Sequence, residues 1–191
     1  MRENGHTLVE LLVAAAILLA GFAVGLPSLK AASVEAHLTG AADVFKGEFL
    51  KARTIATHNG VYTALRFERV GDVHVLSTYV DGNHNGVLAA DIKRGVDKRV
   101  GEPRPLHSGA PGVRIGILPG LPAPPPERGP LDTSDPIRFG RADMLSFSPL
   151  GSATPGTFYL AGEGMQGAVR VNGQTARVRT LIHRHGRWSE R

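Results

Sequence analysis

The 191-residue sequence contains no cysteine, and this absence removes several kinds of chemistry. Without a thiol, the chain forms no disulfide, has no cysteine nucleophile and offers no cysteine ligand to a zinc or iron–sulfur centre. The absence of cysteine does not determine the cellular compartment, because an oxidising space permits disulfides without requiring them. Hydrophobic residues make up 42% of the chain, which is normal for a packed core and argues against a wholly disordered chain.

Charge is missing from one long stretch near the N-terminus. No residue from Leu11 to Leu29 is charged, a run of 19 residues. As a helix, such a run spans roughly 28 Å, close to the ~30 Å hydrocarbon core of a bilayer. Three interpretations compete: a cleaved secretory signal, an ordinary membrane anchor and a prepilin-type segment.

The residues at the start of this run favour the prepilin-type segment. Residues 1–5 (MRENG) contain a single arginine, whereas a secretory signal begins with a basic region. Glu10 lies among apolar residues, where a carboxylate is costly and needs a partner or a function. Residues 5–12 (GHTLVELL) resemble the prepilin processing site of type IV pilins and type II secretion pseudopilins. An ordinary signal or anchor with an isolated glutamate is the alternative.

This resemblance implies a specific maturation. In the family, prepilin peptidase cuts after the glycine, here Gly5, and methylates the new first residue, here His6. Glu10 then becomes the fifth mature residue, and Pro27 falls at the twenty-second, where a proline is common. One position departs from the family, since His6 replaces the usual phenylalanine. Gly5, His6 and Glu10 are thus the predicted processing residues.

Glu10 and Pro27 are also predicted to serve filament assembly. In a filament, the apolar helices would pack in a dry core, where a carboxylate needs a counter-charge. The resemblance supplies one, the N-terminal amine of a neighbouring subunit. Pro27 removes a backbone donor and, with Gly21 and Gly25, predicts a kink or a melted turn near residues 21–27.

After Leu29 the pattern becomes amphipathic. Apolar residues recur at steps of three and four, with most charged residues off that stripe. Asn59-Gly60 is a good helix stop, so one helix is predicted from about residue 7 to 58. Its membrane or filament-core half covers residues 6–29, after a leader of residues 1–5, and its amphipathic half covers residues 30–59. The predicted apolar stripe is Val34, Leu38, Ala41, Phe45, Phe49, Ala52 and Ile55.

Residues 60–191 are predicted to form a β-rich globular domain. Glycine (24) and proline (13) are abundant, which suits a turn-rich sheet domain. Gly71-Asp72 and Asn172-Gly173 are hairpin signals. Ten prolines lie in a surface insert near residues 101–136. The fold class is α+β, with a long N-terminal helix packed on an antiparallel sheet domain of the pilin type. The predicted strands are 61–67, 73–80, 113–118, 137–141, 144–148, 157–160, 168–171 and 175–182.

Several short motifs resemble the GspH/FimT group of minor pilins and pseudopilins. Residues 49–56 (FLKARTIA) lead directly into the first strand, as in that group. Residues 81–86 (DGNHNG), 147–151 (FSPLG) and 186–187 (GR) resemble its later turns and its closing hairpin. The proline-rich insert departs from the group.

The resemblance implies a minor subunit of a type IV pilus or of a type II secretion pseudopilus. Its expected partners are prepilin peptidase, other pilin subunits and an inner-membrane assembly platform. The expected location is the bacterial inner membrane, with a single span and a periplasmic C-terminal domain, and then the filament. No enzyme signature is present, and neither an enzyme activity nor a cofactor is predicted.

One weak metal candidate lies in the middle of the chain. Asp81, Asn83 and Asn85 alternate before Gly86, like the opening of an EF-hand calcium loop, but Ile92 stands where the final glutamate belongs. The alternative is an Asx-rich turn, because Asp and Asn bind their own backbone.

The C-terminal segment is strongly basic. Residues 166–191 contain six arginines and one acid, an excess equal to the whole chain's formal charge of +5. A basic edge with an exposed tryptophan suits nucleic-acid phosphates and bases. Some relatives in the resembled group bind DNA through a C-terminal GRxR element, of which this chain keeps GRW. The alternative function is therefore a double-stranded-DNA-uptake receptor that uses Arg179, Arg184, Arg187, Trp188 and Arg191. The competing interpretation is a solvated edge that protects the sheet from aggregation.

Overall fold

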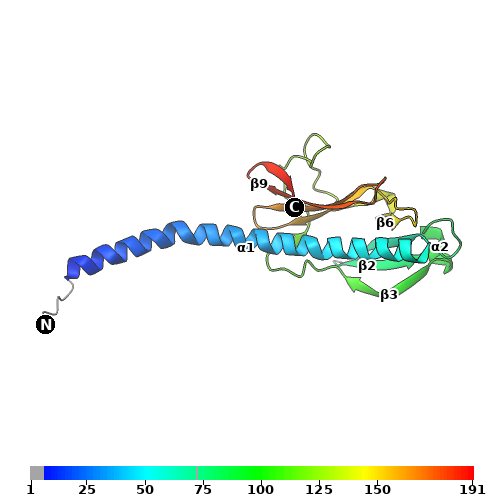
Figure 1. The fold of residues 1–191 in the computed structure, drawn as a ribbon, viewed down its shortest axis with the longest axis horizontal. Helices are drawn as coiled ribbons and strands as arrows, with labels where there is room; N and C mark the ends of the chain where they lie inside the picture. Colours follow the sequence, from blue (N-terminus) through cyan, green and yellow to red (C-terminus); the bar gives the residue numbers. More distant parts are fainter. Residues whose placement is uncertain (1–6, 72) are drawn as a thin grey trace.

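A computed structural model describes residues 7–71 and 73–191, apart from the side chains of residues 22–28. One long helix, α1 (Leu8–Asn59), packs its second half on a β domain and extends its first half away from it (Figure 1). The domain consists of antiparallel strands. The predicted α+β class, a helix on an antiparallel sheet domain, is confirmed.

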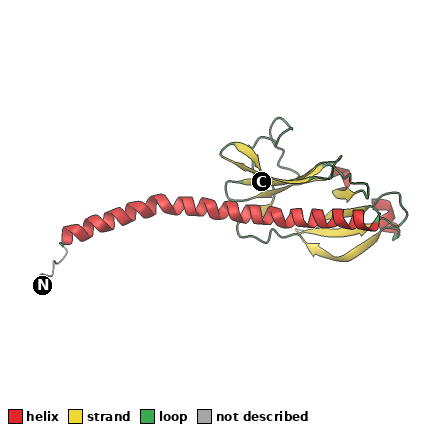
Figure 2. Cartoon of the chain, in the orientation of Figure 1, coloured by secondary structure: helices red, strands yellow, loops and turns green. Residues whose placement is uncertain are grey.

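Helix α1 begins and ends where the sequence predicts. Thr7 is the N-cap, and Gly60 ends the helix in the left-handed conformation, with φ of 68°. The backbone is helical without interruption from residue 8 to residue 59, so the predicted melted turn near residues 21–27 is wrong. A proline removes one backbone hydrogen bond and leaves the rest of the helical ladder in place. Figure 2 shows the helix curving over its first half instead.

The first sheet has the strand order β3-β2-β1-β6. The hairpin predicted at Gly71-Asp72 is present, since Val70 pairs with Val73; Asp72 itself lies outside the described residues. β3 is a strand that the sequence did not predict, because prolines and charges fill it. The strands are β1 (Thr63–Val70), β2 (Val73–Val80), β3 (Lys98–Pro105) and β6 (Met144–Phe147).

The second sheet has the order β10-β9-β8-β7-β4, and β5 also pairs with β7. The strand expected over residues 113–118 shrinks to two residues, and the last strand pair, β9–β10, extends the sheet beyond the predicted end at Ile182. The strands are β4 (Arg114–Ile115), β5 (Ile137–Arg138), β7 (Gly156–Ala161), β8 (Gln166–Val171), β9 (Val178–Arg184) and β10 (Arg187–Glu190). Two short helices complete the domain, α2 (Ala89–Arg94) and the 3₁₀ helix η1 (Gly140–Ala142).

The main core lies where α1 meets both sheets. Phe49 of α1 is fully buried and makes edge-to-face contacts with Phe67, Phe139 and Phe158. Such contacts add to the burial of about 150–250 Å² that each aromatic ring provides. Most of the predicted stripe is buried, whereas Val34 and Ile55 are only partly covered. The buried α1 residues are Leu38, Ala41, Ala42, Phe45, Phe49, Ala52 and Ala56.

The proline-rich insert covers the outer face of the second sheet. Ile117 and Leu131 of the insert pack with Tyr159 and Ala168, whose side chains point away from α1. The buried amide of Gln166 fixes the insert: its Nε2 donates to the Gly116 carbonyl at 3.0 Å, and its Oε1 accepts from the Leu118 amide at 2.8 Å. The insert is therefore a packed layer of the domain.

Candidate functional site: the projecting helix and the sites around it

The first turn of α1 holds Glu10 at a capped helix start. The Glu10 amide donates to Thr7 Oγ1 at 3.3 Å and to the Thr7 carbonyl at 3.0 Å. A carboxylate in this turn interacts favourably with the positive end of the helix dipole. Gly5 and His6, the other predicted processing residues, lie outside the described residues, as does the side chain of Pro27.

The first half of α1 leaves its apolar side chains uncovered. Leucine, valine and isoleucine residues from Leu8 to Leu19 are 53–75% exposed, and Leu29 is 68% exposed. They surround the helix on all sides, so no polar face turns toward water. Contiguous exposed apolar surface of this kind marks an interaction with a protein or a membrane.

Two glycines of the domain, Gly162 and Gly167, lie against α1, and we call them the glycine cradle. A Cβ atom at Gly167 would lie 3.2 Å from Leu38 Cδ1, and one at Gly162 would lie 3.4 Å from Val34 Cγ1. The absence of side chains at these two positions lets the helix approach the second sheet closely. The cradle thus fixes where the packed half of α1 begins.

Ion pairs also join α1 to the domain near the start of its packed half. Glu35 of α1 binds two arginines from the C-terminal edge: Arg184, with Nη1 at 2.6 Å from its carboxylate, and Arg191. Lys30 pairs with Glu163 of the β7–β8 turn at 2.7 Å. These contacts join the helix to the edge of the second sheet where the two separate.

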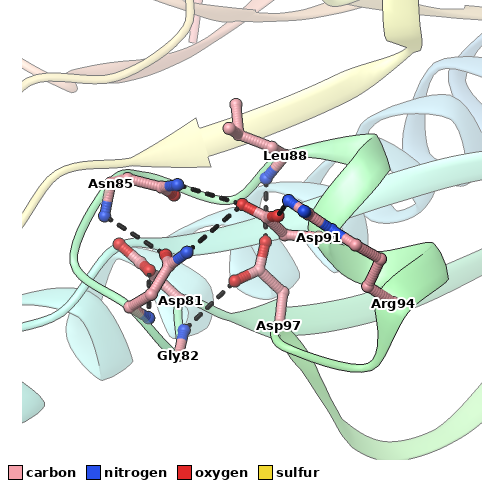
Figure 3. Close-up of polar contacts among 8 residues, drawn as sticks. Asp81, Gly82, Asn85, Leu88, Asp91, Arg94 and Asp97 are labelled. Carbon is pink, nitrogen blue, oxygen red and sulfur yellow. Dashed lines mark hydrogen bonds and ion pairs between the residues drawn. The ribbon is translucent and has the colours of Figure 1, made fainter.

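At the far end of the domain, residues 81–97 form a closed polar loop (Figure 3). Asp81 is buried, and its carboxylate accepts from the amides of Asn83 (3.0 Å), His84 (2.8 Å) and Gly86 (2.7 Å). Asp97, also buried, accepts from the amides of Gly82 and Leu88. Carboxylates replace the backbone partners that a regular element would supply.

Asp91 is the third carboxylate of this loop. It accepts from the side-chain amides of Asn85 (3.0 Å) and Asn83 (3.4 Å) and pairs with Arg94. The hydrogen bonds from Asn85 and Arg94 hold the pKa of Asp91 below its ordinary value, against the effect of burial. The loop therefore closes on its own carboxylates, whose partners all lie within residues 81–97.

The calcium interpretation of Asp81, Asn83 and Asn85 does not fit this geometry. A calcium ion needs converging oxygens, whereas here the Asp81 oxygens face amide hydrogens and the Asn85 amide points its nitrogen at Asp91. Within residues 7–71 and 73–191, no group of three or more histidine or acidic side chains is arranged to hold a metal ion. The Asx-turn alternative describes the loop.

The predicted DNA-binding arginines lie together on β9 and β10, but most of them have acidic partners. Arg184 and Arg191 bind Glu35 of α1, and Arg179 binds Glu190 at 3.3 Å. Arg187 is exposed, with no ion pair among the described residues. Three of these four arginines thus share two carboxylates, Glu35 of α1 and Glu190 of β10, and the edge keeps a net positive charge.

Trp188 is not the exposed aromatic that the sequence suggested. Its indole nitrogen donates to the Pro122 carbonyl at 2.9 Å, and its ring packs in the cluster under the insert. It also contacts buried His183, with 5.2 Å between the ring centroids. Trp188 fastens the last strand to the insert.

The comparisons with known proteins concern the N-terminal end of the chain, where α1 begins. Residues 1–26 match the family described as the prokaryotic N-terminal methylation motif. The N-terminus is of the prepilin type. This motif supports a pilin or pseudopilin that prepilin peptidase processes, and the long helix on an antiparallel sheet domain is consistent with the pilin fold. No curated protein and no solved structure matches the chain.

The predicted membrane span has no confirmation from the structure. Among the residues whose placement is described, no helix is both long and apolar enough to cross a membrane.

Sequence reasoning missed two features of this region. In the sequence, Glu35 is one of the charged residues off the apolar stripe. Its two arginine partners lie 149 and 156 residues further along the chain. Gly162 and Gly167 flank a predicted turn and strand, and isolated glycines in a strand do signal a close backbone approach. That signal identifies a contact but not the partner.

Proposed function

We propose that this chain is a minor pilin or pseudopilin that assembles into a filament through α1. The observation that carries the proposal is the uncovered apolar half of α1, directly after a prepilin-type processing motif. Among the residues that the structure describes, those of the folded domain leave that half uncovered. A bilayer would cover it before assembly, and the equivalent helices of neighbouring subunits would cover it afterwards.

The proposal includes the inner membrane as the starting location and an inner-membrane assembly platform as a partner. Membership of the GspH/FimT group, with a type IV pilus or a type II secretion system as the destination, is supported by the order of the weak motifs. Their sites have matching structural contexts: FSPLG closes β6, and Gly186-Arg187 joins β9 to β10.

DNA uptake, the alternative from the sequence, is not part of the proposal. It needs free guanidinium groups and a free indole at the C-terminal edge. Arg179, Arg184, Arg191 and Trp188 instead have partners within the chain.

Mass spectrometry of the protein from its native host tests the processing step. The mature chain should begin at methylated His6. Replacing Gly5 with valine should leave the unprocessed precursor in the membrane fraction. A mature N-terminus after Ala20 or Ala23 would mean an ordinary secretory signal and would refute the proposal.

The assembly step is tested by Glu10→Ala. The variant should insert into membranes and fold normally, yet be depleted from sheared filament fractions, because the charge pairing with a neighbour's amine is lost. Glu68→Ala, on β1, provides a control that removes a carboxylate from the domain and should assemble normally. Wild-type levels of the Glu10 variant in filaments would contradict the assigned role.

A further inference from the structure

A cleft lies between the proline-rich insert and the outer face of the second sheet. Its volume is about 370 Å³. We call it the insert cleft, defined by Pro126, Glu127, Arg138, Thr157, Tyr159 and Arg170. The volume is within the range of small-molecule sites, roughly 300–1,000 Å³. The cleft lies on the face of the second sheet opposite α1, so it takes no part in the contacts that hold the helix.

Two guanidinium groups of the cleft are held in place by backbone carbonyls. Arg170 donates to the Pro125 carbonyl at 2.5 Å and to Thr157 Oγ1 at 3.1 Å. Arg138 donates through Nε to the Asp135 carbonyl at 3.0 Å and through Nη2 to the Asp132 carbonyl at 2.5 Å. Side chains fixed in this way lose little further freedom when a ligand binds.

Among the residues that line the cleft, two arginines face one glutamate, while Asp132, outside the lining, is close enough for the charge of Arg138 to lower its pKa. Glu127 pairs with Arg170 at 2.8 Å, and among the described residues Arg138 has no carboxylate in an ion pair. Its Nη1 likewise makes no hydrogen bond within that part of the chain. Arg138 lies over the ring of Tyr159, 5.3 Å from the centroid. One cation in the cleft therefore has donors to spare for an anion.

A buried hydroxyl in the cleft also lacks a partner. Tyr159 is fully buried, and among the described residues its hydroxyl makes no hydrogen bond of normal geometry, although the Thr157 side chain lies close enough to lower its pKa. Burial, and then the charge of Glu127, raise the pKa of this phenol, while Arg138, Arg170 and Thr157 act in the opposite direction. A buried hydroxyl without a partner is costly, and a ligand that accepted its proton would remove that cost.

We propose that the insert cleft binds a carboxylated sugar unit, of the uronic acid class. Arg138 holds the carboxylate with its unused donors. The Tyr159 hydroxyl donates to a ring oxygen or hydroxyl, and Glu127 accepts from another hydroxyl. Pro126 and Pro155 offer flat apolar surfaces to the C–H face of the sugar ring. The proposal does not depend on filament assembly.

The test uses the full chain in a polyoxyethylene detergent, which carries neither sugar nor charge. Ligand-observed NMR titrations compare glucuronate, glucose and inorganic phosphate. Glucuronate should bind with a dissociation constant of roughly 1 mM, an affinity typical of so small a ligand. Glucose should bind at least about tenfold more weakly, because Arg138 then has no anion. Equal binding of glucose, or phosphate binding as tight as that of glucuronate, would overturn the proposal.

Three variants separate binding from folding. Tyr159→Phe keeps the packing and removes only the costly unpaired hydroxyl, so it should keep or raise the melting temperature and yet weaken glucuronate binding several-fold. Arg138→Gln should abolish the preference for glucuronate over glucose. Arg177→Gln, at an exposed ion pair with Glu190 outside the cleft, should leave affinity unchanged. Unchanged affinity in both Tyr159→Phe and Arg138→Gln would refute the site.

Discussion

The two halves of α1 differ in what covers them, although they form one helix. Leu12, in the first half, is 61% exposed, whereas Leu38, in the second, is completely buried. Both halves are helical, although only the second packs on the domain. The difference supports the proposal that a partner outside this chain covers the apolar surface of the first half.

Composition matches this difference. The second half presents alanines and two phenylalanines to the sheets and carries charges on its outward side. The first half has apolar residues all round, as a helix in lipid or in a helix bundle does. Substitutions in the second half should therefore change domain stability, and those in the first half should change assembly.

The largest effect is expected from Phe49→Ala. Phe49 is fully buried among three other rings, so its truncation should lower the free energy of unfolding by about 3–5 kcal/mol. Chemical denaturation followed by far-UV circular dichroism measures it. Leu12→Ala is the control and should leave domain unfolding unchanged. A similar loss from both variants would abolish the distinction between the two halves.

The second largest loss of domain stability is expected from a substitution in the glycine cradle. Gly167→Val places a branched side chain against Leu38, and it should destabilise the domain by about 1–3 kcal/mol through overpacking. Gly40→Val makes the same change on the outward side of α1, where nothing lies within 4 Å. The control should change stability by less than about 0.5 kcal/mol. If Gly167→Val is tolerated equally well in denaturation curves, α1 does not need the cradle.

Asp91→Asn tests the loop at the end of the packed region. The folded-state pKa of Asp91 is lowered, so its ionised form stabilises the fold above the unfolded pKa, about 3.9. This contribution is lost as pH falls through the lower, folded-state pKa. The variant should be less stable than the wild type at pH 7, and the two should converge in strong acid. Unfolding midpoints across pH 2–7 measure this, with exposed Asp43→Asn as control. A constant difference at all pH values would contradict the assignment.

The smallest effect is expected from Glu35→Gln. Its pairs with Arg184 and Arg191 are partly exposed on the arginine side, and each such pair contributes about 1 kcal/mol or less. The change should appear locally, as faster amide hydrogen exchange over residues 30–38. Glu190→Gln, which breaks arginine pairs that do not touch α1, should leave that exchange unchanged. Equal exchange in the two variants would show that these pairs do not hold the helix.

Local patterns predicted the elements well where one physical rule dominates. Helix α1 follows from apolar periodicity and from Gly60, which tolerates the left-handed conformation that ends it. The β1–β2 hairpin follows from its turn residues. β3 was missed, because prolines and charges hide a strand that exists through pairing with β2. β10 was not among the strands predicted from the residue pattern, and only the resemblance of Gly186-Arg187 to a closing hairpin pointed to it.

The candidate sites were less predictable, because they depend on partners distant in sequence. The sequence pattern around Asp81 is typical of a calcium ligand, but in the fold its carboxylate accepts hydrogen bonds from backbone amides. Trp188 looked exposed until Pro122 of the insert was placed beside its indole nitrogen. Charge counts over a C-terminal segment cannot show that Glu35 lies against two of its arginines.

The sequence by itself determined the prepilin-type start, the long helix with an uncharged first half, and the α+β class. These depend on residue order and on periods of two or 3.6 residues, which are local properties. Only the tertiary structure decided which carboxylates are used internally, that the proline-rich insert is a packed layer, and that Arg138 and Tyr159 meet in a cleft. Those outcomes depend on contacts between segments far apart in the chain, and packing and desolvation set their energies.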